Sequence, residues 1–170
     1  MALVLHLRGG RALSQFRLDK LLASIAAQGI TVGSVAAEFY HFVELSRPLS
    51  EAEQTTLDRL LTYDQSAYEV APTGTLALVV PRAGTVSPWS SKASEIAQHC
   101  GLDAVVRMER GIAFYLQDAQ GQALPEAVVN RIIPLLYDRM TESVLPSLDA
   151  ADGLFQHIAP AALQTVDVLS

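Results

Sequence analysis

The chain has 170 residues, of which 50% are hydrophobic and 18% are charged, and its formal net charge is −6. This hydrophobic share excludes a disordered chain and is enough for the core of one domain. An acidic chain without clustered cations argues against nucleic-acid binding. A bilayer span needs a run of ~20 mostly apolar residues, and the sequence has none.

The few cysteine and histidine residues argue against a disulfide and against a metal site. The single cysteine, Cys100, excludes an intramolecular disulfide and fits a reducing compartment. The first residues lack the basic start of a secretory signal, so we expect a cytoplasmic protein without membrane association. None of the four histidines has metal-ligand spacing, and the sequence predicts no metal site.

The first half of the chain predicts a strand, a helix, extended structure and a second helix. Residues 3–7 are an apolar strand, and residues 18–26 have helical periodicity before the capping glycine Gly29. Residues 30–45 predict two strands or one bent strand. The Ser50-x-x-Glu53 capping box begins a helix. Its buried face comprises Leu57, Leu60 and Leu61, and a loop is expected over 63–73.

The second half predicts the same order. Residues 76–80 are an apolar strand, and Ser90 or Ser91 is expected to cap the helix that ends at Gly101. The inner face of this helix is expected to comprise Ala93, Ile96, Ala97 and Cys100. Residues 104–118 predict extended structure, and residues 125–145 predict a helix with Pro134 inside.

The two halves repeat with an offset of 72 residues. Under this offset Gly29 corresponds to Gly101, and Phe42 corresponds to Phe114. We therefore expect an α+β fold, an antiparallel sheet covered by helices, built from two strand–helix–strand–helix units related by a pseudo-twofold axis. The predicted domain spans residues 1–146, and residues 147–170 are interpreted as the start of a linker. The last residues, 166–170, resemble an interrupted strand, which suggests a piece of a longer protein.

The segment 81–93 is the first candidate site, because it joins a strand to a helix and is rich in hydroxyls and cations. Its candidate residues are Arg82, Thr85, Ser87, Trp89, Ser90, Ser91 and Lys92. Free helix N–H groups, hydroxyls and positive charge can hold an anion. An N-cap followed by a proline-stiffened turn explains the same residues more simply, and we prefer that interpretation.

The second candidate is the segment 137–142. Asp138 and Glu142 share a face if this segment is helical, with Arg139 between them. Paired carboxylates can bind Mg²⁺ or transfer protons, but a solvated helix face is the preferred interpretation. The strand charges Arg107, Glu109 and Arg110 are expected to make cross-strand pairs.

These residues resemble a known family, the large bacterial-type phosphoribosylformylglycinamidine synthases, in their N-terminal region. The resemblance rests on the segment from Pro81 to Ala93 with its Pro-Trp-Ser-Ser-Lys core, on Arg107-Met-Glu-Arg-Gly111 and on Asp138-Arg-Met-Thr-Glu142. It extends over residues 3–170. Tyr137 stands where many relatives have histidine, which argues against a catalytic role for that position.

The resemblance implies a place in a glutamine amidotransferase of purine biosynthesis. The complete enzyme makes formylglycinamidine ribonucleotide from formylglycinamide ribonucleotide, ATP and glutamine. Its synthetase domain uses ATP and Mg²⁺, and its glutaminase domain supplies ammonia. The N-terminal region is expected to act as a scaffold that packs on both domains, to need no cofactor of its own, and to be inactive alone.

Two other functions remain open from the sequence. A free-standing module could hold phosphate or another anion at Ser90, Ser91 and Lys92. An independent enzyme built on Asp138 and Glu142 is the least favoured, because no nucleophile or cofactor motif accompanies them.

Overall fold

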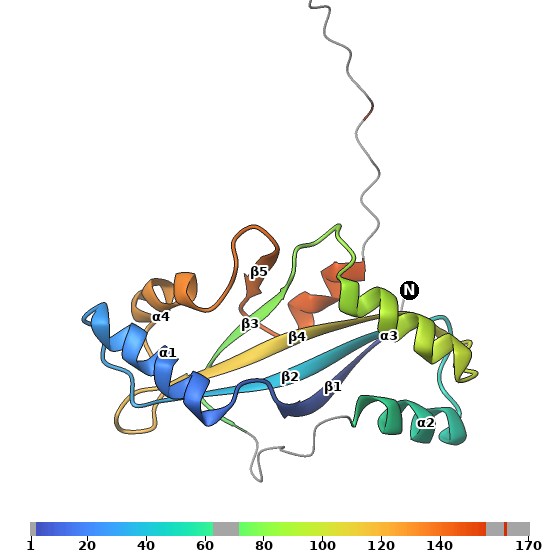
Figure 1. Ribbon diagram of the computed structural model, residues 1–170, viewed down its shortest axis with the longest axis horizontal. Coiled ribbons are helices and arrows are strands. Elements are labelled where there is room, and N and C mark those ends of the chain that lie inside the picture. The colour runs from blue at the N-terminus through green and yellow to red at the C-terminus, as the bar shows by residue number, and fades with distance from the viewer. Residues whose placement is uncertain (1–2, 63–71, 156–161, 163–170) are drawn as a thin grey trace, which may run out of the picture.

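The computed structural model describes residues 3–62, 72–155 and 162, and its centre is an antiparallel sheet. Within these residues the strand order is β1-β2-β4-β3-β5 (Figure 1). The strands are β1 (Leu3–Arg11), β2 (Ser34–Leu45), β3 (Thr75–Pro81), β4 (Val105–Gln117) and β5 (Glu142–Leu145). The predicted α+β fold with an antiparallel sheet is confirmed.

Helices cover one face of the sheet at both of its ends. The α-helices are α1 (Gln15–Ala27), α2 (Glu51–Leu61), α3 (Pro88–His99) and α4 (Glu126–Ile132). Helices α1 and α4 lie together at one end, and α2 and α3 at the other (Figure 1). Both groups pack on the same face of β2, because Val35 and Val43 belong to one alternating set of side chains.

The opposite face is covered in part by the 3₁₀ helix η2 (Asp149–Phe155). Its buried residues Ala151, Leu154 and Phe155 pack against Phe42 and Leu78 of the sheet. The first part of the predicted linker therefore lies on the sheet. The domain boundary at residue 146 stays a prediction.

Most predicted helix ends are confirmed. Ser50 and Glu53 form the predicted capping box of α2. Helix α1 begins before the predicted residues 18–26, with Ser14 as its N-cap. Gly29 and Gly101 follow α1 and α3 with φ of 74° and 83°, the left-handed conformation that glycine adopts at low cost.

The start of α3 differs from the prediction. Its N-cap is Ser87, whose hydroxyl accepts the Ser90 N–H at 3.0 Å, and not Ser90 or Ser91. Pro88 occupies the first helical turn, where its missing N–H is not needed and its fixed φ suits the helix. The helix cap therefore lies three residues before Ser90 and four before Ser91.

The long helix predicted for residues 125–145 is wrong. The structure has α4, the 3₁₀ turn η1 (Ile133–Leu135), a turn and then strand β5. Pro134 removes a backbone donor and clashes with the preceding turn, which ends the α-helix. The apolar residues that follow pair with β3 instead, with Val144 opposite Val79.

The strand after Gly33 and the inner face of α3 are also predicted from the sequence. Residues 34–45 form one strand, and Gly33 lies just before it. Of the predicted inner face of α3, Ala97 is buried, but Ile96 is 42% exposed. Cys100 is exposed and does not face the core as predicted, because α3 ends at His99 and Cys100 is its C-cap. Residues 63–71 of the loop predicted over 63–73 lie outside the described residues, as does the interrupted strand predicted at 166–170.

The internal duplication stays a prediction. Each half contributes one edge-side strand and one central strand, and the two central strands β2 and β4 pair with each other. In that pairing Phe42 lies opposite Glu109, and Ala37 lies opposite Phe114. The 72-residue offset interchanges these two pairs, as a pseudo-twofold axis between the strands requires.

Candidate functional site

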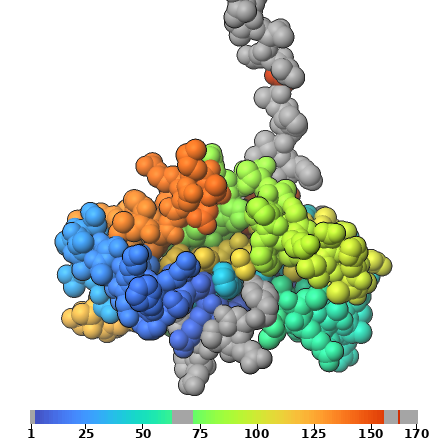
Figure 2. Space-filling view, viewed as in Figure 1, coloured from blue at the N-terminus to red at the C-terminus, as the bar shows by residue number. Residues whose placement is uncertain are grey.

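The two candidate segments from the sequence lie side by side. Pro81 pairs with Glu142 between β3 and β5, and the Arg82 N–H donates to the Thr141 carbonyl at 3.1 Å. Figure 2 shows the turn before β5 (orange) next to the loop after β3 (green). We call the exposed part of these two segments, residues 81–88 and 138–142, the loop–turn surface. It encloses a hollow of about 370 Å³ lined by Val86 and Met140, among others.

The carboxylates of the turn hold its backbone. The Met140 N–H donates to Asp138 Oδ1 at 2.8 Å, and the Asp138 N–H donates to Glu142 Oε1 at 2.9 Å. Asp138 and Glu142 do not share a helix face as predicted, because the helix has ended and Glu142 begins β5. Their contacts fix the shape of a turn that exposes Arg139 and Met140.

The hydroxyls of the first segment are engaged within the protein. Ser90 is buried and donates to the Met108 carbonyl, and Thr85 donates to the Arg82 carbonyl at 2.6 Å. Ser91 and Lys92 are exposed, and Ser91 lies 3.5 Å from the Ser87 carbonyl. These bonds favour a structural role for the serines, in capping and anchoring the start of α3, over a role in binding an anion.

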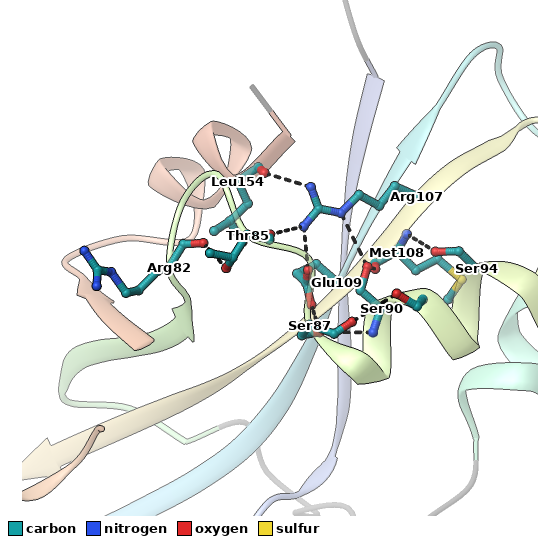
Figure 3. A network of polar contacts seen from close by, with 10 residues as sticks. Arg82, Thr85, Ser87, Ser90, Ser94, Arg107, Met108, Glu109 and Leu154 are labelled. Carbon is teal, nitrogen blue, oxygen red and sulfur yellow. Dashed lines mark hydrogen bonds and ion pairs between the residues drawn. The ribbon is translucent and has the colours of Figure 1, made fainter. Parts of the chain in front are cut away.

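A buried carboxylate lies beneath the segment, and the sequence analysis missed its role. Glu109 is 0% exposed and accepts the Ser87 hydroxyl at 2.6 Å and Arg107 Nη2 at 2.7 Å (Figure 3). Arg107 also donates to the carbonyls of Thr85 and Leu154, at 2.8 Å and 3.2 Å. Arg107 and Glu109 therefore pair along one strand, and not across strands as expected.

Ser87 both caps α3 and donates its hydroxyl to the buried Glu109, so its loss should destabilise the domain more than the loss of an ordinary N-cap. We expect Ser50→Ala to cost about 1 kcal/mol of unfolding free energy, the usual loss of an N-cap. Ser87→Ala should cost about 2–3 kcal/mol, because it also removes a hydroxyl donor from a buried carboxylate. Urea denaturation of the two variants measures the difference. Equal losses would contradict the second role of Ser87.

Trp89 faces inward from α3. Its ring centre is 5.7 Å from that of His41, and the Arg110 guanidinium lies 5.0 Å from its centre. Trp89 also packs against the apolar cluster of β2, β4 and α2, which includes Val43. It anchors α3 to the sheet, and only part of it is available to a partner.

His41 gives the domain a pH dependence. Burial, aided by the positive charge of Arg110, lowers the pKa of His41 to about 4. As the pH falls, His41 is therefore protonated near pH 6.5 in the unfolded chain but only near pH 4 in the folded chain.

The contribution of His41 to stability is complete above about pH 6.5 and is lost as the pH falls toward 4, by about 3 kcal/mol. Urea denaturation between pH 7 and pH 4 measures this loss. His41→Gln should flatten the profile over that interval. An unchanged slope in the variant would show that other groups cause it.

The described residues contain no group of three His, Cys, Asp or Glu side chains that could hold a metal ion. No helix within the same residues has the length and apolar character needed to cross a membrane.

A comparison with known families agrees with these features. Residues 38–155 match the family described as formylglycinamide ribonucleotide amidotransferase N-terminal. The match covers more than half of the chain and includes the loop–turn surface, the Arg107–Glu109 pair and η2. The chain therefore belongs to the N-terminal domain family of formylglycinamide ribonucleotide amidotransferase, a purine-biosynthesis enzyme.

Proposed function

We propose that this chain is the structural and coupling domain of such an amidotransferase. In this role it packs against the synthetase and glutaminase domains and supports the passage of ammonia between them. ATP and Mg²⁺ act in the synthetase domain, and the N-terminal domain alone turns over no substrate. The observation that carries the proposal is the loop–turn surface, which unites the two segments that also carry the family resemblance.

The composition of this surface suits a protein partner. Val86 is 58% exposed and Met140 is 79% exposed, and both line the same hollow. Apolar side chains gathered around a hollow gain free energy when a partner covers them. Arg82 and Arg139 are exposed beside them and can meet carboxylates or carbonyls of that partner.

The backbone beneath these side chains is already fixed. The turn is held by Asp138 and Glu142, and the loop is held by Arg107 and Ser87. A surface that is ordered before binding loses little conformational entropy when the partner docks. This supports a permanent contact between domains.

The proposal is tested by binding of this chain to the separately produced remainder of the amidotransferase. Calorimetry with the unchanged chain should show a complex, and Met140→Asp should weaken it about tenfold or more, since an apolar contact is replaced by a desolvated charge. Val86→Asp should act in the same direction.

Phe16→Asp provides the matched control. Phe16 is 77% exposed, like Met140, but lies on α1 outside the loop–turn surface. Its substitution should leave the affinity unchanged. If Met140→Asp binds as well as the unchanged chain, the loop–turn surface is not the docking site.

A further inference from the structure

Three segments that are distant in the sequence meet at the Arg107 side chain. Its Nη2 donates to the Thr85 carbonyl of the loop–turn surface, and its Nη1 donates to the Leu154 carbonyl of η2. Nη2 also bonds Glu109 on the same strand, and Nε lies 3.4 Å from the Ser90 hydroxyl. Figure 3 shows the guanidinium between the loop and η2.

An arginine is needed for these contacts. The guanidinium presents five N–H donors in a rigid plane and can serve several acceptors in different directions at once. The Thr85 and Leu154 carbonyls belong to segments outside the sheet ladder, where side chains or water must supply the donors. A lysine ammonium could neutralise Glu109 but could not reach both carbonyls from one position.

Each segment also has an attachment of its own. His6 Nε2 lies 2.8 Å from Asp152 Oδ1, which ties η2 to β1. Phe155 is buried, and Arg107 lies 5.4 Å from its ring centre. On the other side, Ser87 ties the loop to Glu109. Among the residues that the structure describes, Arg107 is the side chain that hydrogen-bonds both the loop and η2.

We infer that Arg107 is a positioning residue that makes the loop of the loop–turn surface and η2 respond as one unit. A change that makes η2 open more often then also makes the loop open more often. A partner that orders the loop makes η2 open less often. This inference goes beyond the proposed function and does not depend on it, because both segments belong to this chain.

Hydrogen exchange of the 170-residue chain, followed by mass spectrometry, tests the inference. His6→Ala removes the tie of η2 to β1 and touches no residue of the loop. We expect faster exchange in peptides covering 149–155 and also, by about threefold or more, in peptides covering 82–90. The second effect should vanish when the same change is made in an Arg107→Lys chain.

Two further variants keep the test decisive. Arg107→Met with Glu109→Gln removes the guanidinium together with the buried carboxylate charge and should give the same loss of coupling as Arg107→Lys. If His6→Ala leaves 149–155 unchanged, Phe155→Ala loosens η2 through its apolar anchor, and the same readout on 82–90 applies.

Arg8→Lys is the matched control. Arg8 bonds the buried Glu38 at 2.8 Å on the same face of the sheet, and no bond of it to Thr85 or Leu154 is found among the described residues. It should leave the response of the loop to His6→Ala intact. The inference is overturned if the loop does not respond when η2 is loosened, or if it still responds in the Arg107→Lys chain.

Discussion

Replacing Arg107 with alanine is expected to lower the free energy of unfolding by about 3–5 kcal/mol, the usual cost of breaking a buried ion pair. The reason is the carboxylate of Glu109, which is 0% exposed and would lose the cation 2.7 Å away. Urea denaturation at neutral pH, with far-UV circular dichroism as the signal, measures the loss.

A second substitution separates charge from packing. Glu109→Gln in the Arg107→Ala chain removes the buried charge and keeps an acceptor for the Ser87 hydroxyl. The double variant should therefore be more stable than Arg107→Ala alone. A loss below about 1 kcal/mol for Arg107→Ala, or no recovery in the double variant, would show that the pair is no more than a surface contact.

Phe42→Ala is expected to cost about 3–5 kcal/mol, as large core truncations do. Phe42 is 0% exposed on central strand β2, and its ring lies between the sheet and η2. Its ring centre is 5.4 Å from that of His6, so the truncation also weakens the support of η2. Thermal and urea denaturation should give the same order of stability.

Phe16→Ala is the control for this prediction. The Phe16 side chain is 77% exposed on α1, so its removal should change stability by less than about 0.5 kcal/mol. A similar loss for both variants would contradict the assignment of Phe42 to the core between sheet and η2.

The sequence predicts the layers of the fold better than the end of the domain. Alternating and helical periodicity locate β2, β4 and the first three helices, and the glycines after α1 and α3 mark their ends. The run that becomes β5 is four residues long, too short for its periodicity to distinguish strand from helix. Only its pairing with β3, a contact distant in the sequence, makes it a strand.

The sequence identifies the two segments of the candidate site but does not predict that they lie side by side. Both segments are visible as motifs, but their contact depends on β5. The period of a strand places Arg107 and Glu109 on one face, so an ion pair between them is a signal that the sequence contains. The sequence does not show that Glu109 is buried or that Arg107 also bonds the loop at Thr85 and η2 at Leu154, because these two segments precede and follow β4 at a distance in the sequence.

In the proposed function, this chain completes an amidotransferase without catalysing a step itself. The most direct measurement is glutamine- and ATP-dependent formation of formylglycinamidine ribonucleotide by the separately produced remainder of the enzyme, with and without this chain. We expect product formation to depend on the added chain. Met140→Asp should reduce it at limiting concentrations of the chain, and the chain alone should give no product. Full activity of the remainder without the chain, or turnover by the chain alone, would contradict this role of the domain.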